Sequence, residues 1–581
     1  MDASYSVIHF LAAAPKNRRA VKKLILVATF IFSVSACGQA TVTPQAILVT
    51  VQVPVQQTVQ VPVLVTPTPA LPPQTLRWSV EGVGDLNTLD PPQLTDAQGV
   101  FVAGLLLGGL VKLDAELHVV PDAATWTVSE DGQQYVFKLR NGLRFSDGTP
   151  VTSDDVVFSL TRALDPATGS TTGPFYLANI VGAEELASGQ TKELTGVKAV
   201  DPQTIQVNVR QPSAFFLSQL TFACGYIVSK KQVQANPVKW IEKPAGTGPF
   251  LLKEWMRGQG LVLVPNPNYY GGPLQITELQ LPFFEDSQSA FQAYRAGELD
   301  VMGSQQNGVP AERIPEVRDL PDWRTASGFV VRYVGFNNTV KPFNDARVRQ
   351  AFARSIDKQG LVDKILGKTV RATDRILPAG IPGSEFPIQG LSFNPDAAKK
   401  LLVEAGYPGG RGLGTLTLTY GQEGDNERVV QFLQAQWKEN LGVNVALQPL
   451  ELTAFSSQLD ATYRSPEKGL QFYYSVWGAD YPDPQNFLSQ QLYTGAGNNN
   501  GHFSDAEFDR LTDQADTING DYIKRIKLYN QAEQIAVTQV GWLPLFNPTL
   551  NVLARPYVQG LVLTGQGIVA PDWSAVRGRS K

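Results

Sequence analysis

Alternating hydrophobic and polar positions, followed by turn and capping residues, predict an α+β region at residues 121–160. Residues 135–139 alternate with the period of a half-buried strand, and the glycine-containing pairs at 141–142 and 147–148 predict tight turns. Residues 152–155 have the pattern of a capping box, which predicts the start of a helix. We expect this region to determine the fold rather than to contact a ligand.

In the second half of the chain, stretches with helical spacing of apolar residues alternate with short strands. Asn394 and Pro395 are typical of a helix start, and Gly406 and Gly442 are typical of helix ends. The predicted elements are a helix over 348–356 capped by Asn344 or Asp345, a helix over 394–405, a strand over 416–420, a helix over 430–441 and a strand over 443–447. This alternation favours a mostly parallel α/β layer.

Composition places the chain among ordinary globular proteins and narrows its chemistry. Of 581 residues, 43% are hydrophobic and 18% are charged, and the net charge is −4. We therefore expect no nucleic-acid partner, because the chain has no excess of positive charge to bind phosphates. With three histidines and two cysteines, the chain offers few ligands for a transition metal, and we expect neither a metal nor a cofactor.

The first 36 residues have the layout of a signal peptide. Basic residues precede an apolar run at 24–34, which is about half the roughly 20 residues that span a bilayer. The small residues before Cys37 resemble a lipobox, so we expect Cys37 to be lipidated and to anchor the protein on the extracytoplasmic face of the cell membrane. A plain secretory signal is the alternative. Because the basic residues lie far into the chain, residues 1–20 could also reflect a wrong start site.

Residues 37–73 differ from the rest of the chain in being rich in Val, Thr, Gln and Pro. Almost no charge and no helical period occur there. Regularly spaced prolines predict an extended, semi-stiff stalk and should interrupt strand pairing. A strand-forming segment is the alternative, because valine favours strands.

Several motifs, in order and at fitting spacing, resemble the peptide- and nickel-binding receptors of ATP-binding-cassette (ABC) importers, which form family 5 of the bacterial extracellular solute-binding proteins. The resemblance covers about residues 76–560. Its blocks are Pro121 to Val156, Gly246 to Phe250, Asn266 to Tyr270, Gly297 to Asp300, Phe343 to Asp357, Ala397 to Tyr407 and Trp477 to Asp483.

The resemblance implies an α/β fold of the two-lobed, type II periplasmic-binding-protein class, with a hinge and a small additional α+β domain. We expect lobe I to comprise residues 74–110, 196–290 and 545–581, the additional domain residues 111–195, and lobe II residues 291–544. The implied function is to capture peptides between the lobes and deliver them to the permease subunits of an importer. A monomer is expected.

The segment 472–487 is the best candidate for a binding site, because it combines aromatic residues, two aspartates and two prolines at a strand end. In the family's peptide receptors, the aspartate of the Trp-x-x-Asp element holds the ligand's α-ammonium, and the resemblance carries that role to Asp480. The candidate ligand-binding residues are Asp480, Trp477, Gly478, Ala479, Tyr474 and Tyr481. Alternatively, Asp480 caps a turn, although Asp483 is better placed for that role. Residues 471–487 contain no basic residue for a ligand carboxylate.

Other conspicuous residues have structural interpretations. Gly246 to Phe250 lack the Lys-Ser/Thr of a P-loop and predict a turn before a strand. Arg347, Arg349 and Arg354 are expected on a solvated helix face, and Cys224 is expected as a buried core thiol.

The sequence bears differently on three alternative functions. Members of the family also bind oligosaccharides and nickel chelates, so the ligand class stays open. A secreted hydrolase would need a nucleophile with a base or a pair of spaced carboxylates, and His118 and His502 are the only histidines of the body. We therefore expect the protein not to be an enzyme. A surface adhesin would show repeats, and the body has none.

Overall fold

The computed structural model describes residues 46–52, 58–64, 74–303 and 307–580, in two units that divide after Ala70. In the first unit, β1 (Ala46–Gln52) and β2 (Thr58–Leu64) pair as antiparallel strands, with Leu48 opposite Pro62. The prolines were expected to interrupt pairing, and Pro62 does not. A two-stranded ladder consists of edges, where a proline is tolerated. The expected signal peptide and Cys37 lie outside the described residues, and the stalk stays a prediction.

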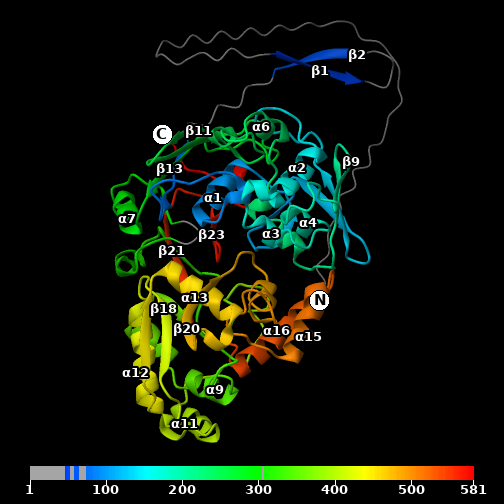
Figure 1. The fold of residues 1–581 in the computed structure, drawn as a ribbon. Coiled ribbons are helices and arrows are strands. Elements are labelled where there is room, and N and C mark those ends of the chain that lie inside the picture. Colours follow the sequence, from blue (N-terminus) through cyan, green and yellow to red (C-terminus); the bar gives the residue numbers. More distant parts are fainter. Residues whose placement is uncertain (1–45, 53–57, 65–73, 304–306, 581) are drawn as a thin grey trace, which may run out of the picture. The chain divides into compact units, whose positions relative to one another are not determined.

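The first sheet of the second unit combines the start, the middle and the end of the body (Figure 1). Its order is β11 (Phe250–Met256), β12 (Gly260–Pro265), β13 (Glu278–Phe284), β3 (Gln74–Arg77) and β24 (Arg579–Ser580), and β4 (Val80–Glu81) also pairs with β13. Its core includes Leu76, Leu263 and Leu279, packed with α1 (Ala97–Leu106). As predicted, β11 begins at the end of the Gly246–Phe250 turn.

The second sheet is antiparallel, in the order β7 (Ala124–Val128), β8 (Gln134–Leu139), β10 (Thr204–Asn208) and β9 (Val197–Asp201). It shares a core with α2 (Ser153–Leu164), α3 (Gly173–Tyr176) and α4 (Ala183–Ala187). The predicted capping box is present, because Thr152 donates its N–H to Asp155 at 2.9 Å. The sheet runs across the expected boundary between residues 195 and 196, and the division into domains stays a prediction.

The third sheet has helices on both faces. Its order is β14 (Val301–Met302), β21 (Trp542–Ala554), β16 (Val330–Phe336), β20 (Phe472–Gly478), β18 (Leu416–Gly421) and β19 (Val445–Leu450), with β15 (Trp323–Ser327) and β17 (Val370–Ala372) also paired to β21. One face packs on α9 (Ala346–Arg354), α11 (Pro395–Glu404) and α12 (Asn426–Leu441), and the other on α15 (Ala506–Thr517) and α16 (Tyr522–Gln539).

This sheet is less parallel than the sequence predicts. β18 is parallel to β19 and β20, whereas β16 is antiparallel to β20 and β21. Parallel pairs need crossover connections, and α12 and α13 (Leu452–Arg464) supply them for β18, β19 and β20. The predicted helix and strand types are confirmed, including Asp345 as the cap of α9 and Gly442 as the end of α12.

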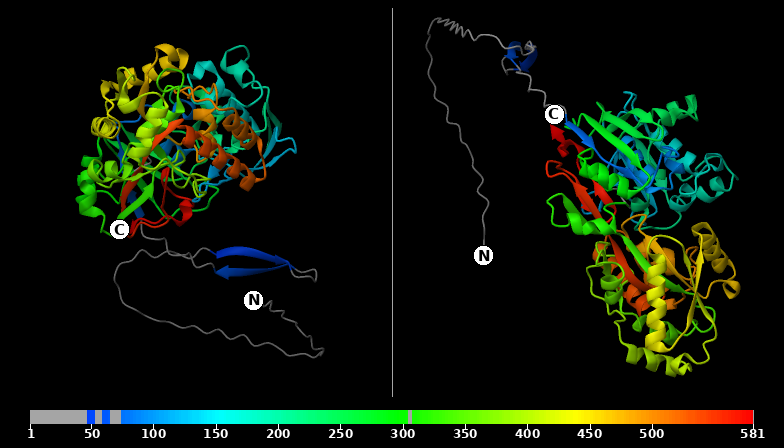
Figure 2. Two further views of the ribbon diagram at one scale, coloured as in Figure 1. Left: turned by 90° about the horizontal axis from the view of Figure 1, so that it is seen from below. Right: turned by 90° about the vertical axis from the view of Figure 1, so that its left-hand side faces the viewer.

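β21 connects the two lobes of the fold. Leu543 and Leu545 belong to the core on one face of the third sheet, while Val552 and Ala554 belong to the core of the first sheet. In Figure 2 this strand runs between the two parts. We call the part built on the first two sheets lobe one, and the part built on β16, β18, β19 and β20 lobe two.

Shorter elements complete the two lobes. They are β5 (Val111–Leu113), β6 (Val119–Pro121), β22 (Val562–Thr564), β23 (Gly567–Val569), α5 (Phe216–Gln219), α6 (Lys230–Ala235), α7 (Ser287–Arg295), α8 (Ile314–Val317), α10 (Lys358–Lys364) and α14 (Ser489–Leu492).

The expectation of a solvated arginine face on α9 is wrong for Arg349. Its side chain is buried and donates to the carbonyl oxygens of Phe343 at 2.6 Å and Gln539 at 2.7 Å. These acceptors, at the C-terminal end of α16 and before α9, replace water, and burial lowers the pKa of Arg349 to about 10. Arg347 is exposed and pairs with Asp345, as expected of a surface residue. Cys224 is a buried free thiol, as predicted, and burial raises its pKa to about 12.

Candidate ligand-binding site

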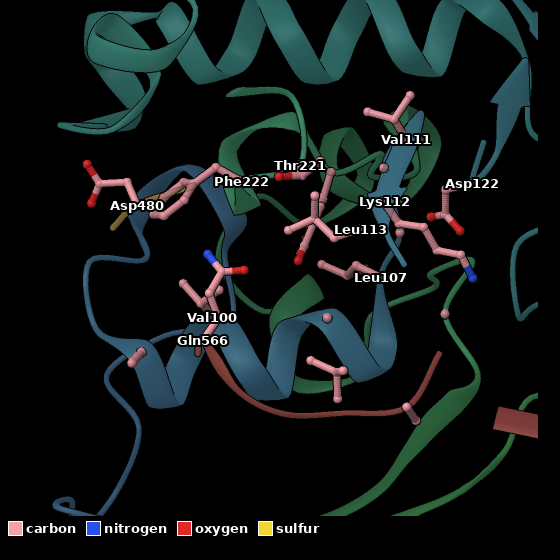
Figure 3. Close-up of a pocket in the computed structure, with 18 of the residues that line it drawn as sticks. Val100, Leu107, Val111, Lys112, Leu113, Asp122, Thr221, Phe222, Asp480 and Gln566 are labelled. Atoms are coloured by element: carbon pink, nitrogen blue, oxygen red, sulfur yellow. The ribbon is translucent and has the colours of Figure 1, made fainter. Parts of the chain in front are cut away.

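A cavity of about 530 Å³ lies between the lobes, within the range of small-molecule sites. Lobe one contributes residues of α1, β5 and the segment around Phe222, and lobe two contributes Phe329, Val330 and the end of β20. Figure 3 shows apolar side chains such as Val100, Leu107 and Leu113 along its wall. Because its walls come from both lobes, a ligand in this cavity would contact both.

The end of β20 and the loop that follows it carry most of the predicted binding residues into this cavity. Trp477, Gly478, Ala479 and Asp480 all line it. Tyr474 is instead buried in the core between β20 and the helices α9 and α12, because its position in the strand faces those helices. Tyr481 is also buried, and its ring lies near the rings of Tyr176 and Phe215 of lobe one.

Asp480 has polar partners in the protein but no cation. Asn486 Nδ2 donates to Asp480 Oδ2 at 3.2 Å, and the Asp480 N–H donates to Asn486 Oδ1 at 3.1 Å. A hydrogen bond from the hydroxyl of Tyr176 reaches the carboxylate from lobe one. Burial raises the pKa of Asp480, and these hydrogen bonds oppose the rise. No described Lys, Arg or His forms an ion pair with Asp480.

Asn486 fixes the geometry of this loop. It is fully buried, and its backbone carbonyl also accepts a hydrogen bond from the Trp477 ring nitrogen at 2.9 Å. One asparagine therefore holds both Trp477 and Asp480 in place. The sequence analysis did not single out Asn486, although its position six residues after Asp480 lies within the predicted segment.

Asp483, three residues after Asp480, has the structural role that the sequence favoured for it. Its Oδ1 accepts from the Gln485 N–H at 2.9 Å and so caps a short 3₁₀ turn. Its carboxylate also pairs with Arg525 of α16 through bonds of 2.8 and 2.6 Å, and both side chains are buried.

Lobe one contributes charged residues that the sequence analysis missed, namely Asp96, Lys112 and Asp122. Asp122 accepts a hydrogen bond from the Tyr270 hydroxyl, and the Arg140 guanidinium lies 5.0 Å from the centre of the Tyr270 ring. Burial raises the pKa of Asp122, and the Tyr270 hydrogen bond opposes the rise. Asp122 lines the cavity, although residues 121–160 were expected to determine the fold rather than to contact a ligand. For Lys112, the sequence does contain a signal that could have identified it, namely a lysine between two apolar residues of a short strand.

Neither a metal-ligand cluster nor a histidine is found in this cavity among the described residues. They contain no group of three or more His, Cys, Asp or Glu side chains placed to hold a metal ion. His118 is exposed and lies 3.5 Å from Asp114, and His502 stacks on Tyr463 at 5.6 Å. Neither histidine lines the cavity. Among the described residues, every helix is too short or too polar to span a bilayer.

Comparisons with known proteins agree with this geometry. Residues 118–499 match the model of the family described as "Bacterial extracellular solute-binding proteins, family 5 Middle". The "Probable deoxycholate-binding periplasmic protein YgiS" of Escherichia coli (strain K12) is 32% identical over 514 residues, covering 85% of this chain and 92% of that protein. The "Periplasmic murein peptide-binding protein MppA" of the same organism is 29% identical over 496 residues, covering 83% of this chain and 90% of that protein.

Solved structures show the same fold. The open, unliganded form of the periplasmic murein tripeptide-binding protein MppA superposes with a TM-score of 0.73 at 26% identity, covering 86% of this chain and 98% of that chain. These relatives are described as periplasmic binding proteins. The chain therefore belongs to family 5 of the bacterial extracellular solute-binding proteins.

Proposed function

We propose that this protein is a lipid-anchored extracytoplasmic receptor that captures peptides with a free N-terminus between its lobes and delivers them to the permease of an ABC importer. The observation that carries the proposal is Asp480, a carboxylate that lines the cavity and lacks a cationic partner among the described residues. An ionised carboxylate removed from water is costly unless it is paired. A ligand ammonium would supply the missing charge.

Three neighbours support this role for Asp480. Asn486 orients the carboxylate from lobe two, and the Tyr176 hydroxyl reaches it from lobe one. Because both groups donate to the carboxylate, they favour its charged form. The Trp477 ring lies in the same wall and offers an apolar surface next to the charge. An α-ammonium with an adjacent carbon chain fits this combination.

Contacts between the lobes support capture by closure. Tyr481 of lobe two stacks on Phe215 of lobe one, with ring centres 6.4 Å apart and an interplanar angle of 7°. The Ala214 N–H donates to the Asp516 carbonyl at 2.9 Å. A ligand that touches both lobes binds the closed state more tightly and therefore shifts the population toward it. Closure then excludes water from the charge pair.

The test compares peptides that have free and acetylated N-termini. Asp480→Asn should weaken binding of free-amine peptides about 150- to 4,000-fold, because breaking a buried charge pair costs about 3–5 kcal/mol. N-acetylated peptides should bind the wild type equally poorly. Isothermal titration calorimetry measures both effects, with Asp460→Asn, an exposed residue of α13, as the matched control.

Equal affinity for acetylated and free peptides would contradict the proposed role of Asp480. An oligosaccharide or a nickel chelate would then be the better ligand class. Equal binding of free peptides by Asp480→Asn and Asp460→Asn would also contradict the role of Asp480, although peptides would remain the ligand class.

The membrane anchor is a separate part of the proposal. Cys37 follows small residues at the end of the apolar run, where a diacylglycerol would be added. Two acyl chains give stable attachment, whereas one chain binds only marginally. Cys37→Ala should release the protein from membranes or block its processing, as measured by fractionation and mass spectrometry. A mature surface protein that retains residues upstream of Cys37 would contradict this part.

A further inference from the structure

The cavity has a second polar end, built by lobe one. In Figure 3, Lys112 and Asp122 lie at the side opposite Asp480. Lys112 is the middle residue of β5, which pairs with β6. Its neighbour Val111 is buried in the core of lobe one, so strand alternation turns Lys112 away from that core. A cation and Asp480 therefore lie at opposite ends of one cavity.

Lys112 is not neutralised by the protein in the way that its neighbour Asp122 is. The Asp122 carboxylate accepts hydrogen bonds from the Tyr270 hydroxyl and the Gly109 N–H, and it is attracted to both Arg140 and Lys112. The Lys112 ammonium forms no hydrogen bond and no ion pair with any described residue. Two cations, Lys112 and Arg140, thus face the single carboxylate of Asp122, which leaves one positive charge in excess at this end of the cavity.

The third carboxylate of the cavity does not cancel this excess. Asp96 is the cap of α1, and its Oδ1 accepts from the Gly99 N–H at 2.7 Å. The partial positive charge at a helix N-terminus offsets such a carboxylate. The cavity is therefore polarised, with a negative end at Asp480 and a positive end at Lys112.

We propose that Lys112 binds the terminal carboxylate of the ligand, so that the cavity selects short zwitterionic peptides whose two ends reach Asp480 and Lys112 together. This inference rests on the proposed function and narrows its ligand class. Residues 471–487, which hold the ammonium end, contain no basic residue. The carboxylate partner thus comes from the opposite lobe, and a bound peptide would bridge the lobes through two charge pairs.

The test uses di-, tri- and tetra-alanine as free acids, C-terminal amides and N-acetyl derivatives, measured by calorimetry. For the best-fitting length, the wild type should bind the free acid about 10- to 150-fold more tightly than the amide, which is the range for one charge-assisted hydrogen bond. Lys112→Met should bind the acid and the amide equally. Lys198→Met, at an exposed position of β9, should keep the preference. Thermal unfolding checks that each variant is folded.

Each of the other outcomes contradicts either the role of Lys112 alone or the proposed peptide function as well. If the wild type binds acid and amide equally but still rejects N-acetyl peptides, Lys112 has no such role and the proposed function stands. The same holds if Lys112→Met retains the preference for the acid. If none of the alanine peptides binds, the peptide function itself fails, and the role of Lys112 fails with it.

Discussion

Two aspartates of one loop, three residues apart, occupy opposite kinds of environment. Asp483 is buried against Arg525, which neutralises it inside lobe two. Asp480 faces the cavity, and its protein partners are neutral hydrogen-bond donors. The comparison teaches that a buried carboxylate with its counter-ion inside the protein supports the fold, whereas one without it is available to a ligand. Sequence position alone does not separate the two cases.

The Asp483 region is a connected network rather than a single pair. The Arg525 Nη2 lies 3.3 Å from the Tyr529 hydroxyl, which in turn donates to Asp516. Ser489 also donates to Asp516, at 2.9 Å. These residues join the loop to α14, α15 and α16. The loop that presents Asp480 is thus anchored by charges that the ligand does not contact.

The largest effect is expected when the network loses its cation. Arg525→Met leaves Asp483 buried without its counter-ion, which should lower the free energy of unfolding by about 3–5 kcal/mol. Urea denaturation of the unliganded protein measures this change. Arg510→Met removes an exposed arginine that pairs with Glu507 on α15, and it should have little effect. If the two substitutions had equal effects, the buried Arg525–Asp483 pair would contribute no more to stability than the exposed Arg510–Glu507 pair, and Asp483 would lose its structural role.

A second effect concerns pH. Burial raises the pKa of Asp516 to about 7, although hydrogen bonds from Tyr529 and Ser489 oppose the rise. Between about pH 4 and pH 7 the unfolded chain has released this proton and the folded protein still holds it, so the Asp516 contribution to stability is lost as pH rises through this window.

Asp516→Asn should remove this loss, because asparagine does not titrate. The stability of the variant relative to the wild type should increase by up to about 1.4 kcal/mol per pH unit across that window. Denaturation midpoints measured from about pH 4 to about pH 8 test it. A constant difference between variant and wild type would show that Asp516 does not titrate there.

The smallest effect is expected for the stability of Asp480→Asn without ligand. Burial raises the pKa of Asp480, so its ionised form is disfavoured in the folded protein. Asparagine keeps an acceptor for Asn486 and Tyr176, and the unfolding free energy should stay equal or rise by less than about 1 kcal/mol. Thermal unfolding compares the two proteins. A large loss of stability would place Asp480 in the same structural class as Asp483.

Local signals in the sequence predict the elements of this fold well. The capping box at Thr152 and Asp155, the Asn394 cap with Pro395 and the stop at Gly442 are all confirmed, because these signals act within one turn of the chain. The role of Asp483 as a cap follows from the same kind of signal. The segment that carries Asp480 could be found because its motif resembles the family's motif.

Long-range features could not be predicted in this way. Arg349 has helical spacing beside surface arginines, yet it is buried, and one of its acceptor residues, Gln539, lies at the end of α16, 190 residues away. The antiparallel pairing of β16 depends on strands that arrive from distant segments. Lys112 and Asp122 enter the cavity only because lobe one brings β5 and the end of β6 opposite the end of β20 and its loop. Tyr474 and Tyr481 share the predicted segment, but packing of the surrounding helices and rings buries them.

The pairing of β24 with β3 has a consequence for the order in which the protein folds. Gly578 donates its N–H to the side chain of Gln74, a contact between residues 504 positions apart. Lobe one therefore cannot complete its sheet until the last segment of the chain is present, whereas the elements of lobe two from β16 to α16 lie within one continuous stretch. Contacts between distant residues form slowly, because a long loop must close before they contribute any stability. During synthesis, when the N-terminus emerges first, lobe two can thus fold before the final strand of the lobe-one sheet is available.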